Sequence, residues 1–211
     1  MSLRHHPSDS VLTRYAAGGL GKGPALVVEA HLGACAACRR EVAQWEAVGG
    51  ALLDRLPPAA MAPDALARAL ARIETTPPPP GPRVMLPTGI DLSAALEALP
   101  LGRRRWLGPG VWVQPVLDQP GGGKTYLLRT GPGQKLLQHG HTGEEFVCVL
   151  HGGFSDDAGR YGPGDFAQAD PGRDHAPVAD LDGECVCLIS TDGPLRMRGL
   201  IGRLIQFMVG L

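Results

Sequence analysis

The sequence predicts an α+β multidomain protein, in which an N-terminal helical bundle is followed by a β-barrel. Up to about residue 76 the chain is rich in Ala and Leu at helical spacing, whereas from 89 onward it is rich in Val, Gly and turn dipeptides. A proline run at 77–82 separates the two parts, because consecutive prolines neither extend a helix nor donate to a sheet. We therefore expect a helical domain at 1–76, a Pro-rich linker at 77–88 and a strand-rich domain at 89–211.

Four helical segments are expected in the first part. The first is capped by Ser8 or Ser10, and the second has Pro24 in its first turn. A third segment covers about 38–56 and is closed by two prolines. The fourth, 63–73, is amphipathic, since three apolar residues fall on one stripe: Leu66, Leu70 and Ile73.

From residue 101 onward the hydrophobic period shifts towards two, which is typical of strands between Gly-rich turns. The segments with this pattern are 112–116, 125–129, 135–141, 146–150, 164–168 and 184–190. Many short strands in about 100 residues indicate a sandwich or a small barrel. The C-terminal tail, 195–211, instead spaces its apolar residues along one helical face, and we expect it to dock onto the barrel or a partner.

The charge balance limits the possible partners. The chain has 20 basic and 21 acidic residues, a formal net charge of -1, which argues against electrostatic binding to nucleic acid. The N-terminus lacks an apolar stretch behind a basic start, so it does not resemble a secretory signal. Without a run of about 18 apolar residues, no membrane span is expected. We expect a cytoplasmic protein with no direct nucleic-acid or membrane partner.

The first candidate site lies in the helical part, where His31, Cys35 and Cys38 are spaced four and then three residues apart. On one helix this spacing places all three on one face, and cysteines at this spacing favour metal or redox chemistry. Zinc takes four tetrahedral nitrogen or sulfur ligands, so a fourth must come from elsewhere. His5 and His6 are available upstream, and we favour His6. The alternative is that both cysteines are small core residues and His31 lies at the surface.

This arrangement resembles the zinc-binding anti-sigma domains of bacteria over roughly residues 1–75. The resemblance implies a helical bundle that wraps around an extracytoplasmic-function sigma factor and blocks its binding to core RNA polymerase. It also implies that zinc keeps the inhibitory shape. A segment of this size buries only about 60% of its unfolded surface, so a zinc-stapled bundle would gain stability that a small core lacks.

The second candidate site lies in the strand part. His139, His141 and Glu145 share one side of a strand if the register holds through Gly143, and His175 can approach from a neighbouring strand. Three imidazoles and one carboxylate make a mixed nitrogen and oxygen site that suits Zn, Fe, Mn or Ni. The alternative is a barrel of the same class whose site holds no metal.

The spacing of these four residues resembles the two sequence motifs of the cupin barrel, and the first motif matches at every position. The resemblance implies a cupin β-barrel with a divalent metal, with zinc favoured over Fe, Mn or Ni. The second motif departs from the family at Asp170 and Ala179, where the family usually has Pro and Asn. These departures leave the four ligands in place and bear more on catalytic detail than on metal binding.

One further pair of residues is a candidate for chemistry. Cys185 and Cys187 are two residues apart in an expected strand, so both thiols share one face. Two interpretations stay open at this point, namely packing in the core or a pair that is sensitive to oxidation.

Together, the two parts resemble the ChrR-type anti-sigma factors over nearly the whole chain. The resemblance implies a transcriptional regulator and not an enzyme. The helical part would hold a sigma factor inactive in the cytoplasm, and the barrel would cause its release when singlet oxygen or related oxidants appear. Because the same four barrel ligands also serve dioxygenases and isomerases of the cupin superfamily, a cupin metalloenzyme is the alternative function.

Overall fold

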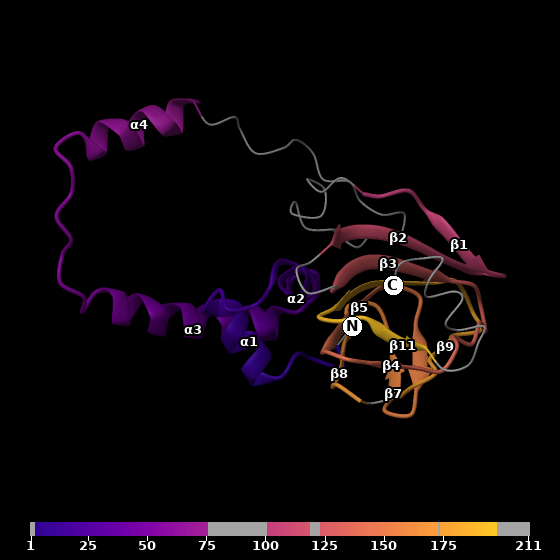
Figure 1. Cartoon of the computed structure of the whole chain (residues 1–211). Coiled ribbons are helices and arrows are strands. Elements are labelled where there is room, and N and C mark those ends of the chain that lie inside the picture. The colour runs from indigo at the N-terminus through magenta and orange to yellow at the C-terminus, as the bar shows by residue number, and fades with distance from the viewer. Residues whose placement is uncertain (1–2, 76–100, 119–122, 173, 198–211) are drawn as a thin grey trace.

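Helices and strands occupy separate parts of the chain. The computed structural model describes residues 3–75, 101–118, 123–172 and 174–197. Within these ranges four helices come first and eleven strands follow, and Figure 1 shows the helices on one side of a β-barrel. The predicted linker at 77–88 and most of the predicted C-terminal tail lie outside the described residues. No helix in the described ranges is long and apolar enough to span a membrane.

The helices are α1 (Asp9–Ala16), α2 (Lys22–Ala34), α3 (Ala36–Leu53) and α4 (Ala65–Thr75). The four predicted helical segments are therefore confirmed. Ser8 is the N-cap residue of α1, and Pro24 lies in the first turn of α2. The helices differ in burial, since most of α2 is buried whereas α4 has no buried residue.

The prediction that His31, Cys35 and Cys38 lie on one helical face is wrong, because the helix is interrupted at Cys35. The backbone of Cys35 is extended (φ -110°, ψ 101°), and this residue is both the C-cap of α2 and the N-cap of α3. Its sulfur accepts a hydrogen bond from the backbone N–H of Cys38 (3.4 Å), as an N-cap side chain does. The three residues are brought together by two helices that meet at Cys35.

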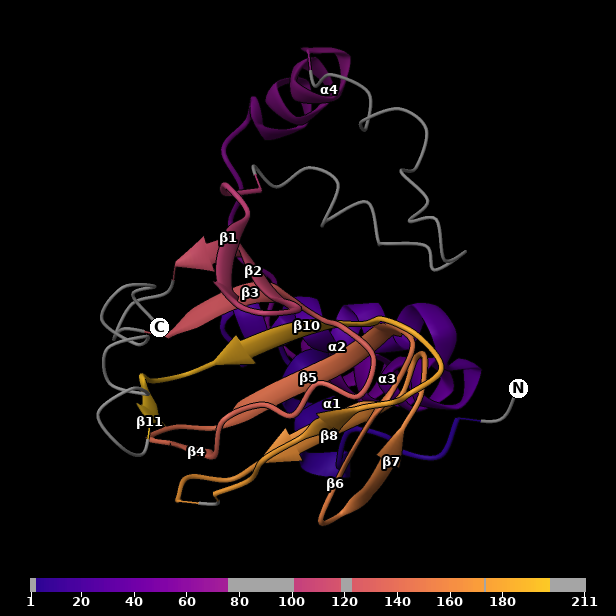
Figure 2. The ribbon, with the colours of Figure 1, turned by 90° about the vertical axis from the view of Figure 1, so that its right-hand side faces the viewer.

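The strands form three sheets in the described part of the chain. A six-stranded antiparallel sheet has the order β1-β2-β3-β10-β5-β8, a three-stranded sheet has the order β7-β6-β9, and β11 pairs with β4 (Figure 2). The bounds are β1 (Arg105–Gly108), β2 (Val111–Asp118), β3 (Lys124–Thr130), β4 (His139–His141), β5 (Glu145–His151), β6 (Phe154–Asp156), β7 (Gly159–Tyr161), β8 (Phe166–Ala169), β9 (Val178–Ala179), β10 (Cys185–Thr191) and β11 (Leu195–Met197).

The longer strands agree with the predicted segments, and the short ones differ. The predicted strands at 112–116, 125–129, 146–150 and 184–190 fall within or nearly within β2, β3, β5 and β10. Of 135–141 only the last three residues form a strand, and 164–168 begins in a turn before β8. Strands of two to four residues are too short to show a period. At the start of the predicted helical tail the chain instead forms β11, because β4 offers it backbone partners.

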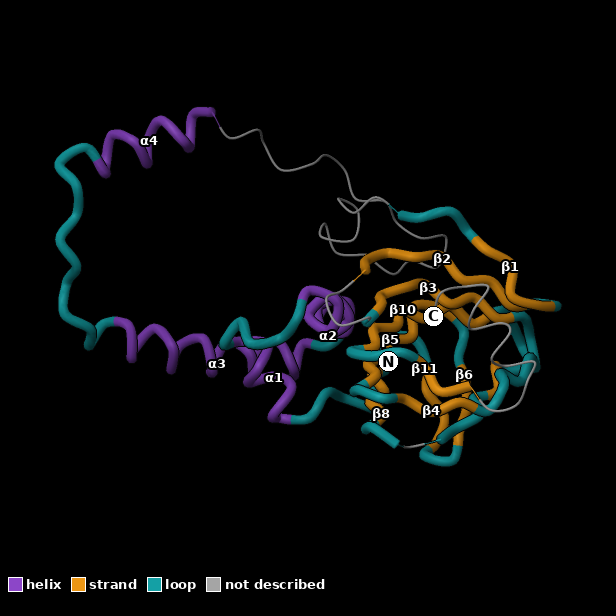
Figure 3. Tube along the Cα trace, viewed as in Figure 1, coloured by secondary structure: helices purple, strands orange, loops and turns teal. Residues whose placement is uncertain are grey.

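The helices and the barrel share a hydrophobic core. Val27 and Val28 of α2 belong to the same buried cluster as Phe146 and Leu150 of β5 and Leu188 of β10. Figures 2 and 3 show α2 lying across the outer face of the six-stranded sheet at these strands. A second cluster lines the barrel interior. A displacement in the sheet can therefore reach α2 through direct side-chain packing.

Two candidate metal centres

Four side chains converge where the N-terminal segment meets the junction of α2 and α3: His6, His31, Cys35 and Cys38. Their candidate ligand atoms all lie within 4.8 Å of one another. His6 Nδ1 is 3.4 Å from each thiol sulfur, and His31 Nε2 is 3.3 Å from Cys38 Sγ. On one tetrahedral zinc ion, a nitrogen and a sulfur stand about 3.6 Å apart, given the usual bond lengths. The donor set and its spacing therefore fit zinc.

A hydrogen bond to the barrel sets the protonation of the His31 ring. His31 Nδ1 lies 2.7 Å from the carbonyl oxygen of Gly164, which can only accept, so Nδ1 carries the hydrogen. Burial lowers the pKa of His31, which keeps the ring neutral and leaves Nε2 as an acceptor that faces Cys38. Gly164 has a φ of +85°, and a Cβ there would stand 2.9 Å from the Cβ of Ala34, so this close approach requires glycine.

The protonation of the Cys38 thiol in this cluster depends on whether a metal is bound. Burial, together with a smaller effect of the neighbouring Cys35, raises the pKa of Cys38 to about 12. Without a cation the Cys38 thiol is therefore protonated near neutral pH. Because zinc binds the thiolate, metal binding at this site has to release that proton.

The barrel also holds the N-terminal segment that carries His6. The buried Asp165 accepts backbone N–H bonds from Arg4 (2.8 Å) and His5 (3.1 Å). Burial would raise the pKa of Asp165, but the backbone N–H groups of Gly162, Arg4 and His5 together outweigh it and hold the pKa below its usual value. The His5 ring turns towards the barrel, where its Nε2–H donates to the carbonyl oxygen of Arg160 (3.1 Å). His6, which the sequence analysis favours as the fourth ligand, is the histidine that the structure places in the cluster.

The second cluster lies in the barrel. It consists of His139 and His141 on β4, Glu145 at the start of β5, and His175 in the loop before β9. The expectation that one strand continues through Gly143 is wrong, because the chain bends at 142–144 and Glu145 belongs to the next strand. Two backbone hydrogen bonds join His139 and His175 (3.1 and 3.0 Å), so these residues lie side by side. The Nε2 atom of His175 is 3.1 Å from that of His139 and 3.2 Å from that of His141. The carboxylate of Glu145 is 3.4 Å from His141 Nε2.

Two of these imidazoles present unprotonated nitrogens to each other. His139 Nδ1 donates to the carbonyl oxygen of Leu137 (2.8 Å), and His175 Nδ1 donates to the carboxylate of Asp156 (3.4 Å). In neutral rings both Nε2 atoms then carry lone pairs, which repel at 3.1 Å unless a cation lies between them. Nitrogens bound to one metal ion stand about 3.0 to 3.4 Å apart. The arrangement therefore fits a divalent metal.

The protonation states of these four residues also depend on whether a divalent cation is bound. Burial lowers the pKa of His139, and burial together with the neighbouring imidazoles lowers the pKa of His141 to about 3, so these two rings are neutral. Burial raises the pKa of Glu145 to about 8, with a further contribution from Asp156. A divalent cation would instead lower the pKa of Glu145, because it stabilises the ionised carboxylate. The residues would then offer three nitrogens and one anionic oxygen.

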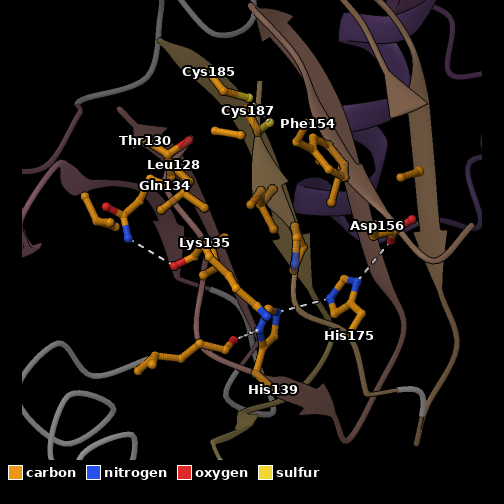
Figure 4. A pocket seen from close by; sticks show the side chains of 18 of the residues that line it. Leu128, Thr130, Gln134, Lys135, His139, Phe154, Asp156, His175, Cys185 and Cys187 are labelled. Carbon is orange, nitrogen blue, oxygen red and sulfur yellow. Dashed lines mark hydrogen bonds and ion pairs between the residues drawn. The ribbon is translucent and has the colours of Figure 1, made fainter. Parts of the chain in front are cut away.

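A cavity of about 350 Å³ adjoins the barrel cluster. Its walls are mostly aliphatic and aromatic, and Figure 4 shows Leu128 and Phe154 between the imidazoles at one end and Cys185 and Cys187 at the other. The two sulfurs are 3.6 Å apart, which confirms that both thiols share one face of β10. The hydrogen bond between them lowers the pKa of Cys185 and raises that of Cys187. Cys185 is therefore the more easily ionised of the two.

An exposed apolar surface, which we call the outer helix face, is formed by the C-terminal part of α3, the loop after it and α4. Its residues are Trp45, Val48, Leu52, Leu53, Leu56, Met61, Leu66, Leu70 and Ile73. Leu52, Leu70 and Ile73 are 61%, 53% and 71% exposed, so the predicted apolar stripe of α4 is covered by no part of the described chain. Figure 1 shows α4 and the outer end of α3 away from the barrel. A set of large exposed apolar side chains on consecutive helices is typical of an interaction site.

Helices with a zinc-type His and Cys cluster, joined to a barrel that carries a second candidate metal cluster of three His and one Glu, define a zinc-finger-type helical part followed by a cupin-like domain. Residues 102–195 match the ChrR cupin-like domain family, and residues 10–39 match a zinc-finger family. The chain is 38% identical over 212 residues to the anti-sigma-E factor ChrR of Cereibacter sphaeroides, with 98% of both sequences covered. It therefore belongs to the ChrR family of anti-sigma factors.

A solved structure agrees with this assignment. The crystal structure of Rhodobacter sphaeroides SigE in complex with the anti-sigma ChrR superposes with a TM-score of 0.73 at 36% identity, covering 90% of this chain and 100% of that chain. Because these relatives are regulators, the chain is a regulator and not an enzyme, although the cupin fold also occurs in enzymes. The metalloenzyme alternative is not supported. The helical cluster is consistent with the zinc of the matched zinc-finger family.

Proposed function

We propose that this protein is a cytoplasmic anti-sigma factor that keeps an extracytoplasmic-function sigma factor from core RNA polymerase. The observation that carries the proposal is the whole-length identity of 38% to an anti-sigma factor, together with a relative whose crystal structure contains its sigma factor. The division of labour follows the sequence: residues 1–76 inhibit, 77–88 link and 89–211 sense. With a net charge of -1, direct nucleic-acid binding is not part of this function.

The outer helix face is the surface that would contact the sigma factor. It extends from the barrel on α3 and α4 and carries large apolar side chains, including Trp45, that are exposed in the described part of the chain. Burial of apolar surface drives most protein association, and a few anchors, tryptophan among them, contribute most of the binding energy. The partner therefore needs a complementary apolar groove.

The helical zinc would keep this surface in its binding shape. We assign His6, His31, Cys35 and Cys38 as its ligands, because their atoms converge from three separate segments of the chain. When bound, zinc joins the N-terminal segment to the α2–α3 junction. The direction in which α3 leaves this junction sets the position of the outer helix face.

The barrel would sense oxidative stress of the singlet oxygen type. We assign His139, His141, Glu145 and His175 as ligands of a second divalent metal, zinc before Fe, Mn or Ni. Cys185 and Cys187 at the far end of the adjoining cavity are oxidisable groups that a small oxidant can reach. Oxidation of the groups at either end would spread through β10 to the core shared with α2, and would favour a state that binds the sigma factor less well.

Substitutions at the barrel cluster and at the cysteine pair should impair oxidant sensing without impairing sigma-factor binding. In the purified full-length complex with the cognate sigma factor, Glu145→Ala and Cys185→Ser/Cys187→Ser are expected to bind the sigma factor within about twofold of wild type, because the outer helix face is intact. Light with a photosensitiser, which generates singlet oxygen, should release the sigma factor from wild type and release several-fold less from both variants. Size-exclusion chromatography measures the released fraction. Equal release from wild type and both variants would contradict the sensing role.

A further inference from the structure

A buried carboxylate outside the four barrel ligands contacts the cluster. Asp156 lies at the end of β6, and its Oδ2 is 3.4 Å from His175 Nδ1 (Figure 4). The two side chains are only 6% and 8% exposed. The other oxygen of Asp156 accepts the backbone N–H of Ala158 (2.9 Å), which fixes the carboxylate in the turn between β6 and β7. Asp156 is therefore held in place and directed at the outer nitrogen of a metal-site histidine.

The three imidazoles differ in what their outer nitrogens meet. His139 Nδ1 donates to a backbone carbonyl, and His141 Nδ1 is buried with no hydrogen-bond partner among the described residues. His175 alone of the three donates to a carboxylate. Such a pairing fixes the ring orientation and makes the inner nitrogen a stronger ligand, and its loss typically weakens metal binding about 10- to 100-fold.

The hairpin that carries Asp156 also contacts the N-terminal segment. Asp156 on β6 is paired with Gly159 on β7. At the other end of β7, Tyr161 lies against the His5 ring with 4.3 Å between the ring centroids, and the Arg160 carbonyl accepts a hydrogen bond from the same ring. His5 is adjacent to His6 of the helical cluster. One short hairpin thus contacts the neighbourhood of both metal clusters.

We propose that Asp156 is a positioning residue for the barrel metal, and that the β6–β7 hairpin transmits occupancy of that site to the segment carrying His6. With metal bound, His175 is fixed and its hydrogen bond restrains Asp156, so the hairpin is held against His5, next to His6. Without metal, His175 and the hairpin lose this restraint. The metal-affinity part stands independently of the proposed function, whereas the signalling role of the hairpin rests on it.

The first test measures metal affinity. Cobalt(II) is titrated into the full-length chain carrying Asp156→Ala or Asp156→Asn, with Asp118→Asn on the exposed end of β2 as the matched control. Cobalt in the helical cluster gives thiolate charge-transfer absorption, which the barrel site lacks, so the two sites are read separately and the helical signal reports an intact fold. We expect about 10- to 100-fold weaker barrel binding for Asp156→Ala and a smaller loss for Asp156→Asn, which keeps an acceptor. Unchanged barrel affinity in a folded Asp156→Ala chain would overturn the positioning role.

The second test follows the hairpin itself. Backbone hydrogen exchange is measured at residues 3–6 and 159–161 with and without barrel metal, in wild type and in metal-saturated Asp156→Ala. Metal is expected to slow exchange several-fold in wild type and to have little effect in Asp156→Ala. An absence of metal-dependent protection in wild type would overturn the transmission role. Because neither test contains a sigma factor, failure of the proposed function would appear instead as a lack of sigma-factor binding by wild type.

Discussion

Replacing Cys38 with alanine is expected to abolish zinc binding in the helical part and to weaken sigma-factor binding by at least about 100-fold. The reason is the energy involved, because a structural zinc contributes about 10 to 16 kcal/mol, comparable to or larger than the whole stability of a domain. Without zinc, the N-terminal segment and the α2–α3 junction lose the ion that would join them. Zinc content and sigma-factor affinity, measured by isothermal titration on full-length protein, check the prediction.

Cys148→Ala is the matched control for this experiment. Cys148 is a buried thiol in the shared core but belongs to neither cluster, and burial raises its pKa to about 12, so it stays protonated. Its removal should cost only the packing of one small side chain and leave zinc content unchanged. Sigma-factor affinity that survives in a zinc-free Cys38→Ala chain would show that zinc does not maintain the inhibitory shape.

Charged substitutions on the outer helix face are expected to have the second large effect. Leu52→Asp and Ile73→Asp should each weaken sigma-factor binding by about 30-fold or more, because buried interface anchors contribute about 2 kcal/mol or more each. Both residues are exposed in the free chain, so the free energy of unfolding should change by no more than about 0.5 kcal/mol. Binding is measured by surface plasmon resonance and stability by urea unfolding.

Leu181→Asp provides the comparison, since Leu181 is 87% exposed on the barrel and distant in sequence from the helices. Leu181→Asp should leave both sigma-factor affinity and the free energy of unfolding unchanged. If Leu52→Asp and Ile73→Asp bind as tightly as Leu181→Asp, the sigma factor contacts another surface, and the assignment of the outer helix face is wrong.

The spacing of the metal ligands is the feature of the two sites that could be predicted most directly from the sequence. His139, His141 and Glu145 lie within seven residues, so they stay close even though the expected single strand is interrupted at 142–144, and the structure adds His175 through two backbone bonds. The separation of helices from strands was equally readable, because it rests on hydrophobic period and on a proline run. These features depend on neighbours in sequence.

Features that depend on distant contacts could not be read in this way. The break at Cys35 arises because its side chain caps α3, although the spacing from His31 also suits an unbroken helix. Asp156 and Asp165 are ordinary turn residues in the sequence, and only the fold directs them at His175 and at the N-terminal segment. The packing of α2 on the sheet likewise cannot be predicted from the hydrophobic pattern of α2, because an apolar helix face does not specify its partner.

The central claim is that each part of the chain holds its own metal ion. Elemental analysis of the purified full-length protein tests it most directly, with Cys38→Ala and His141→Ala measured alongside. We predict two metal equivalents per chain in wild type and one in each variant, with the zinc that His141→Ala retains bound by thiolates. One equivalent or none in wild type, or the loss of both ions through either single substitution, would contradict the account.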